Sequence, residues 1–182
     1  PGLLLFALSL TFAAFDWLMS LDPHFYSTIF GVYYFAGGTQ GMFAALILVL
    51  LFLQRSGMLR NAVTVEHFHD LGKFAFGFTV FFAYIAFSQY LLIWYANIPD
   101  ETQWYLQRWG PWAGVSIALI FTTFVFPLLT LMSRQAKRTM PILATGAVLI
   151  LVGRAVDQFW LVMPAFDPQN QGPSTTWMNL TS

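Results

Sequence analysis

The chain has 182 residues, of which 58% are hydrophobic and 9% are charged, whereas an average soluble domain is roughly 25% charged. One soluble core cannot bury that much apolar surface, so the composition predicts an integral membrane protein whose outer faces contact lipid. The zero formal net charge argues against nucleic acid as a partner, and the absence of cysteine excludes disulfides, thiolate-held iron–sulfur clusters and covalently attached haem c within the sequence.

Five apolar segments are long enough to cross a bilayer as helices, which takes about 20 residues each. The expected fold is an all-α, polytopic transmembrane helix bundle with about five spanning helices within residues 1–164. The chain enters an apolar run directly at Pro1, without the basic segment of a secretory signal. It is therefore expected to be a fragment of a larger membrane subunit. The spans are expected at residues 2–21, 28–53, 71–96, 112–132 and 141–163, and a polar, non-cytoplasmic tail at 165–182.

Basic residues predict the orientation, because Lys and Arg gather in cytoplasmic connections. Six flank the second and fourth connections, whereas Arg108 alone lies on the other side. The side with six is therefore expected to face the cytoplasm. These six are Arg55, Arg60, Lys73, Arg134, Lys137 and Arg138.

Near the far end of the first span lies a group of titratable residues, Asp16, Asp22 and His24. They are either a proton exit or ordinary loop residues. In the second span, Gly37 and Gly41 form a small-xxx-small pattern, which predicts close helix packing.

The third span begins with titratable side chains that helical spacing brings together. His69 and Lys73 are four residues apart, and Asp70 and Lys73 are three apart, so all three can meet near the cytoplasmic surface. Histidine titrates near neutral pH, and a carboxylate can pass a proton onward.

A polar stripe continues along the same helix at spacings close to 3.6 residues. It either orders a file of water for protons or supplies hydrogen bonds between helices. The stripe comprises Lys73, Gly77, Tyr84, Ser88 and Tyr95, with Gln89 beside it.

Arg154 and Asp157 lie three residues apart in the fifth span, past its midpoint toward the far side. Ionisable groups at membrane depth are costly unless they are paired or hydrated, so both are candidate functional residues. One interpretation is a salt bridge that locks this helix to a neighbour, and the other is a role in proton or quinone chemistry. The histidines, His24, His67 and His69, fall in loops or near helix starts, so axial ligands for a membrane haem b are not expected.

Several of these phrases resemble one known family. They are FDWLMSLDP at 15–23, HDLGK at 69–73, FSQY at 87–90, IWYANIP at 93–99, RAVD at 154–157 and WLVMP at 160–164. Together they are similar to the F subunit of bacterial alternative complex III, which belongs with the polysulfide-reductase-type (NrfD-like) membrane subunits. The resemblance extends over most of the chain, although family members have more than five helices.

The resemblance implies a place in a quinol-oxidising complex of the bacterial cytoplasmic membrane. Such a complex oxidises menaquinol or ubiquinol and passes electrons to a cytochrome c or a copper protein. Its haem c groups and iron–sulfur clusters belong to partner subunits, namely an iron–sulfur subunit and multihaem cytochromes c, and a related C-type membrane subunit lies beside the F subunit. This chain would then hold no redox centre.

The combined hypothesis is a membrane subunit that contributes quinone-side architecture and a proton path. His69, Asp70 and Lys73 would form its cytoplasmic start. Tyr84, Ser88 and Gln89 would follow in the middle, and Arg154 and Asp157 in the far half. Two alternatives stay open, a secondary transporter or channel, and a purely structural membrane anchor.

Overall fold

A computed structural model describes residues 2–59, 62–167 and 171–173. It is 84% helical, without strands among the described residues, and five of its helical segments are long and apolar enough to cross a membrane. These findings confirm the expected all-α, multi-pass membrane fold. The five segments are Leu4–Leu21, Phe30–Arg55, Val65–Ala96, Gly110–Leu131 and Met140–Phe166.

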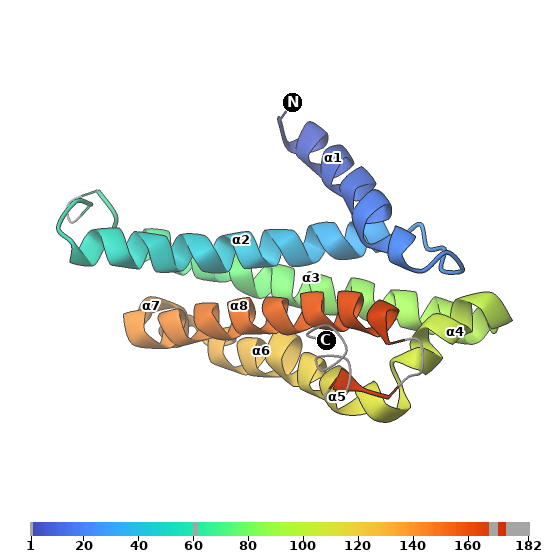
Figure 1. The fold of residues 1–182 in the computed structure, drawn as a ribbon. Coiled ribbons are helices and arrows are strands. Elements are labelled where there is room, and N and C mark those ends of the chain that lie inside the picture. The colour runs from blue at the N-terminus through green and yellow to red at the C-terminus, as the bar shows by residue number, and fades with distance from the viewer. Residues whose placement is uncertain (1, 60–61, 168–170, 174–182) are drawn as a thin grey trace, which may run out of the picture. The chain divides into compact units, whose positions relative to one another are not determined.

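Figure 1 gives the order of the helices along the chain. The first three spans are α1 with η1, α2 and α3, the fourth is assembled from η2, α5, η3 and α6, and the fifth is α8 with η4. The bounds are α1 Gly2–Trp17, η1 Met19–Leu21, α2 Phe30–Arg55, α3 Val65–Ala96, α4 Pro99–Gln107, η2 Gly110–Trp112, α5 Ala113–Ile120, the π-helical η3 Phe121–Val125, α6 Phe126–Leu131, α7 Arg134–Arg138, α8 Met140–Val162 and η4 Met163–Phe166.

Helix α3 begins at Val65, earlier than the expected residue 71. The reason is a local cap that the hydropathy pattern does not reveal. The backbone N–H of Thr64 donates to Nδ1 of His67 (3.1 Å), and the Thr64 hydroxyl lies 2.8 Å from the same nitrogen. This arrangement resembles a capping box in which His67 replaces the usual Glu or Gln. His69 and Asp70 therefore lie inside the helix.

Helix α3 ends where its backbone turns left-handed. Asn97 has a φ of 51°, a conformation that Asn tolerates better than most residues and that commonly terminates helices. Ile98 is then extended, as expected for a residue before proline, and Pro99 occupies the first turn of α4.

The chain divides into two compact units, and three long helices contribute to both. Unit 1 contains Pro1–Phe35, Ile85–Leu119 and Val156–Ser182, and unit 2 contains Ala36–Tyr84 and Ile120–Ala155. Among its described residues, unit 1 has a buried core rich in aromatic side chains. Its largest members are Phe25, Phe30, Tyr33, Trp104, Trp112 and Trp160.

Unit 2 has a mainly aliphatic core drawn from α2, α3, α6 and α8. In lipid such a core is stabilised mainly by close packing, so small residues at contacts are informative. A Cβ on Gly153 of α8 would lie 2.7 Å from the carbonyl oxygen of Thr122 in η3, so only glycine permits this approach. The core residues are Ala44, Ile47, Leu51, Phe68, Ala75, Leu131, Leu143, Ala147 and Ile150.

Two sequence expectations fall partly outside the described residues. The polar tail expected at 165–182 is described only at 165–167 and 171–173, where Asp167 is buried. Arg60, one of the six residues used for orientation, also lies outside them.

Candidate functional site

The middle of the fourth span departs from a regular α-helix. In the π-helical turn η3, the N–H of Phe126 donates to the carbonyl of Phe121. Pro127 follows in the first turn of α6. Because proline has no N–H, it cannot donate to the carbonyl of Thr123, four residues earlier.

The side chain of Gln40 in α2 donates to that carbonyl. Its Nε2 atom lies 3.3 Å from the Thr123 oxygen and 3.0 Å from Oγ1 of Thr79 in α3. The Thr79 hydroxyl in turn donates to the carbonyl of Ala75 (2.8 Å). These three buried residues, Gln40, Thr79 and Thr123, are called the Gln40 cluster below, and they join three spans of unit 2.

The Gln40 cluster retains one acceptor at membrane depth. Oε1 of Gln40 is buried and has no hydrogen-bond partner among the described residues. In unit 1, Oε1 of the buried Gln89 in α3 has the same property. Each oxygen can accept a hydrogen bond from a hydroxyl group of a ligand or from water.

The side chain of Arg154 packs closely against two glycines of α2, Gly37 and Gly41. Its guanidinium carbon is 4.7 Å from the ring centroid of Phe82, and its Cγ would lie 3.5 Å from a Cβ on Gly41. A Cβ on Gly37 would overlap the guanidinium group itself. The two glycines thus accommodate a charged side chain of α8 at membrane depth, a more specific role than the helix packing expected from their spacing.

Asp157, further along α8, belongs to unit 1 and is fully buried. The hydroxyl of Tyr33, near the start of α2, donates a hydrogen bond to its Oδ1 atom. Tyr33 is itself buried and stacks on Phe30, with ring planes 17° apart. A carboxylate and a phenol, both able to exchange protons, are therefore joined inside two spanning helices. The pairing of Arg154 with Asp157 stays a prediction.

The structure brings together the residues expected near the start of the third span. Nζ of Lys73 is 2.8 Å from Oδ1 of Asp70, and Nδ1 of His69 is 3.9 Å from the same oxygen. The other acidic residue near the start of α3, Glu66, also has a basic partner, because it forms an ion pair with Arg138 of α7. The role of this group in proton uptake stays a prediction.

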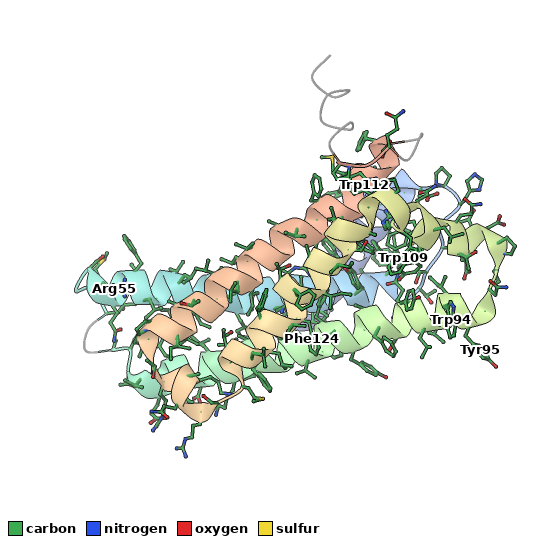
Figure 2. All side chains as sticks on the ribbon, turned by 90° about the horizontal axis from the view of Figure 1, so that it is seen from below. Arg55, Trp94, Tyr95, Trp109, Trp112 and Phe124 are labelled. Carbon is green, nitrogen blue, oxygen red and sulfur yellow. The ribbon has the colours of Figure 1, made fainter. Side chains whose placement is uncertain are left out.

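Most of the polar stripe on α3 faces away from the helices described here. Tyr84 is 65% exposed and Tyr95 is 84% exposed, and Figure 2 shows Tyr95 pointing away from the helix. Ser88 is half-buried, and only Gln89, beside the stripe, is fully buried. A file of water would have to be enclosed by helices, and the described helices alone do not enclose this stripe.

The group near the end of the first span is similarly open. Asp16 and His24 are exposed, and Asp22 is half-buried. The Asp22 carboxylate accepts a hydrogen bond from the backbone N–H of His24 (3.1 Å), which is a local turn contact. This geometry is that of loop residues, and the proton-exit alternative stays untested.

Sequence reasoning missed Arg108, which is buried at the C-terminal end of α8. Its Nη2 donates to the carbonyl of Leu161 (3.1 Å), its Nε to that of Trp160 (3.3 Å) and its Nη1 to that of Trp104 (2.8 Å). The guanidinium carbon also lies 3.5 Å from the ring centroid of Trp104. A cation here satisfies carbonyls that a helix end leaves without partners. The signal in the sequence was a lone Arg among Trp104, Trp109 and Trp112.

Burial lowers the pKa of Arg108 from 12.5 to about 9, against an opposing effect of the Asp22 charge. The group remains protonated at neutral pH. Burial also raises the pKa of the neighbouring Tyr105 hydroxyl well above its usual 10.0. Arg108 is therefore a charged, dehydrated group whose role is to hold α4 against the end of α8.

Lys137 has a similar position in unit 2. Its Nζ donates to the carbonyls of Leu131 (2.7 Å) and Met132 (3.2 Å), at the end of α6. Burial lowers the pKa of Lys137, and the nearby charge of Lys73 lowers it further. Lys137 lies between the fourth and fifth spans, as the sequence predicts, but its burial against these carbonyls has no signal in the sequence.

Comparison with models of known protein families gives no match to this chain, and comparison with curated proteins finds no significantly similar sequence. A functional assignment therefore depends on the arrangement of the chain's own residues.

Proposed function

We propose that the chain is a membrane subunit of a quinol:electron-acceptor oxidoreductase of the alternative complex III type, located in the bacterial cytoplasmic membrane. It contributes quinone-side architecture and groups that move protons. Electrons pass through haem c and iron–sulfur clusters held by partner subunits. Those partners are multihaem cytochromes c, an iron–sulfur subunit and a related C-type membrane subunit.

The observation that carries this proposal is the hydrogen bond from Tyr33 to the fully buried Asp157. Oxidation of a quinol releases two protons with its two electrons, so a quinol-oxidising complex needs proton acceptors at membrane depth. A buried carboxylate in a spanning helix is rare unless it has such a function. Tyr33 fixes the direction of the carboxylate and can exchange a proton with it.

A quinol also fits the acceptors that the structure leaves open. A quinol head group carries two hydroxyl donors, and Oε1 of Gln40 and Oε1 of Gln89 are buried acceptors with no partner among the described residues. They lie in different units, so each is a separate candidate contact. Menaquinol and ubiquinol share this donor chemistry, and either would serve as substrate.

Purification of the full chain from its native membrane tests the proposal. A tagged protein, extracted in mild detergent, is analysed by mass spectrometry and by a reduced-minus-oxidised haem spectrum. Multihaem cytochromes and an iron–sulfur subunit should co-purify, and the preparation should oxidise quinol. A haem-free protein that purifies alone, under conditions in which other respiratory complexes stay intact, would contradict the proposal.

One observation favours a transporter or channel as second candidate. The fourth span is interrupted by the π-helical η3 and by Pro127, and interrupted helices near mid-span are typical of transporter binding sites. A transporter or channel predicts that solute or ions cross the membrane of lipid vesicles reconstituted with this chain and no other protein. A purely structural anchor instead predicts that neutralising Asp157 impairs assembly of the complex and leaves turnover of assembled complexes unchanged.

A further inference from the structure

The connection between the fourth and fifth spans carries a shallow basic cavity that is open at the surface. Helix α7 lies between Leu131, which ends one span, and Met140, which begins the next. Its side chains and the residue after it border a cavity of about 440 Å³. The lining residues are Arg134, Gln135, Arg138 and Thr139.

The cavity has a net positive charge even when the ion pairs within unit 2 are taken into account. Arg138 pairs with Glu66, and Asp70 pairs with Lys73. Arg134 is exposed and forms no ion pair among the described residues. The two arginines of the cavity therefore have only one carboxylate between them.

We propose that this cavity binds the phosphate of an anionic phospholipid head group. Arg134 and Arg138 are four residues apart, so their guanidinium groups lie on one side of α7 and can both donate to phosphate oxygens. The Gln135 amide adds a further donor. The Thr139 hydroxyl donates to the carbonyl of Gln135 (2.9 Å), which leaves its oxygen free to accept from a glycerol hydroxyl, as in phosphatidylglycerol.

A lipid fits this cavity better than free phosphate because apolar surface adjoins it. The cavity lies where spans end, which is the depth of phospholipid head groups. Met132, which precedes α7 in the chain, is 62% exposed, and Ile142, which follows α7, is also exposed. These side chains can contact acyl chains while the arginines hold the phosphate.

Lipid retention by the full chain in mild detergent tests the proposal. The protein is equilibrated with equal amounts of phosphatidylglycerol and phosphatidylcholine, and the bound lipids are quantified by native mass spectrometry. Arg134→Gln should lower the retained ratio of phosphatidylglycerol to phosphatidylcholine about fivefold, the factor expected for one basic contact. Arg55→Gln is the matched control, because Arg55 is exposed at the end of α2, as labelled in Figure 2, and does not line the cavity.

A second variant changes the ratio in the opposite direction. Glu66→Gln removes the carboxylate that competes for Arg138, so retention of phosphatidylglycerol should rise. Equal losses in Arg134→Gln and Arg55→Gln, or no change in either Arg134→Gln or Glu66→Gln, would overturn the proposal. The lipid assignment would also fail if 10 mM inorganic phosphate displaced phosphatidylglycerol from the wild-type protein, because the site would then recognise free phosphate.

Discussion

The hydroxyl group of Tyr33 in α2 donates a hydrogen bond to the carboxylate of Asp157 in α8, across 124 positions of sequence. The two residues join the second and fifth spans within unit 1. Both are buried, so water does not compete for either group. The contact is consequently expected to stabilise the fold as well as to hold a protonatable pair.

Tyr33→Phe removes this donor while keeping the aromatic ring. We expect the free energy of unfolding to fall by about 1–2 kcal/mol, because the buried Oδ1 atom of Asp157 loses this hydrogen-bond donor. Unfolding by SDS titration in mixed micelles measures the change. Tyr84→Phe removes an exposed hydroxyl from α3 and should alter stability by less than about 0.5 kcal/mol. Equal effects of the two substitutions would show that the Tyr33 hydroxyl has no structural role.

Gln40 and Pro127 should be coupled energetically although no hydrogen bond joins their side chains. Gln40→Met removes the donor to the Thr123 carbonyl, and we expect a cost of about 0.5–1.5 kcal/mol, in the range found for hydrogen bonds between spanning helices. Pro127→Ala restores a backbone N–H that can donate to the same carbonyl. In the Pro127→Ala background, Gln40→Met should therefore cost less. A double-mutant cycle that shows strict additivity would contradict this account of η3.

The glycines of the spans should differ sharply in their tolerance of alanine. A Cβ on Gly153 would press against backbone atoms of Thr122, so Gly153→Ala should be destabilising by roughly 1–3 kcal/mol. The atoms nearest to a Cβ on Gly37 are those at the end of the Arg154 side chain, so Gly37→Ala should displace that side chain at a smaller cost in stability.

Two further glycines serve as controls. Nothing lies within 4 Å of a Cβ on Gly77 or Gly114, and alanine favours helices, so Gly77→Ala and Gly114→Ala should be neutral or stabilising. SDS titration of the four variants gives the comparison. If Gly153→Ala proved as stable as Gly77→Ala, the close contact between α8 and η3 would be refuted.

The buried Arg108 predicts how stability changes with pH. Its pKa is lowered from 12.5 to about 9 by burial, so between these values the unfolded chain binds more protons than the folded one. Stability should therefore rise with pH above about 9, by at most about 1.4 kcal/mol per pH unit. Below about pH 9, Arg108 is protonated in both the folded and the unfolded chain, and folding bears the full cost of burying its charge.

Unfolding measured between pH 8 and pH 10.5 tests this expectation. Because burial raises the pKa of Tyr105 above its usual 10.0, this residue lowers stability above about pH 10, where tyrosine ionises in the unfolded chain. The contribution of Arg108 is therefore the difference between the pH profiles of the wild type and of Arg108→Gln. Arg108→Gln should abolish the gain relative to the wild type, whereas Arg134→Gln, at an exposed position, should retain it. Identical pH profiles for wild type and Arg108→Gln would mean that the carbonyls of Trp104, Trp160 and Leu161 keep Arg108 charged throughout.

The fold class could be predicted because lipid imposes one simple requirement. Each span needs about 20 apolar residues with satisfied backbone groups, and hydropathy reports both conditions. The start of α3 was predicted too late because four of the six residues at 65–70 are polar. A local cap by Thr64 and His67, rather than hydropathy, determines where that helix begins.

The candidate site was predicted only in part. Asp157 and Arg154 stood out because charge inside a span is conspicuous, but their contacts, Tyr33 and Gly37, come from another helix and leave no mark in local spacing. The importance of Gln40 depends on the Thr123 carbonyl next to Pro127, which becomes evident only when α2 and η3 are placed together.

The burial of two basic residues could not be predicted for a related reason. Arg108 and Lys137 lie between spans, as expected, but each is buried against the last carbonyls of a helix. Counting charges by side indicates orientation and gives no information on burial. The exposed positions of Tyr84 and Tyr95 likewise follow from which face of α3 meets α2 and α8, which a periodic stripe does not specify.

The measurement that tests the central claim most directly is quinol oxidation by purified complexes carrying Asp157→Asn. Haem content and subunit composition of the complex are measured in parallel, with Asp16→Asn, at an exposed position, as control. Our account predicts an assembled complex with normal haem content whose turnover falls at least tenfold, while Asp16→Asn oxidises quinol at the wild-type rate. An assembled Asp157→Asn complex with unchanged turnover would contradict the proposed role of the Tyr33–Asp157 pair in proton transfer.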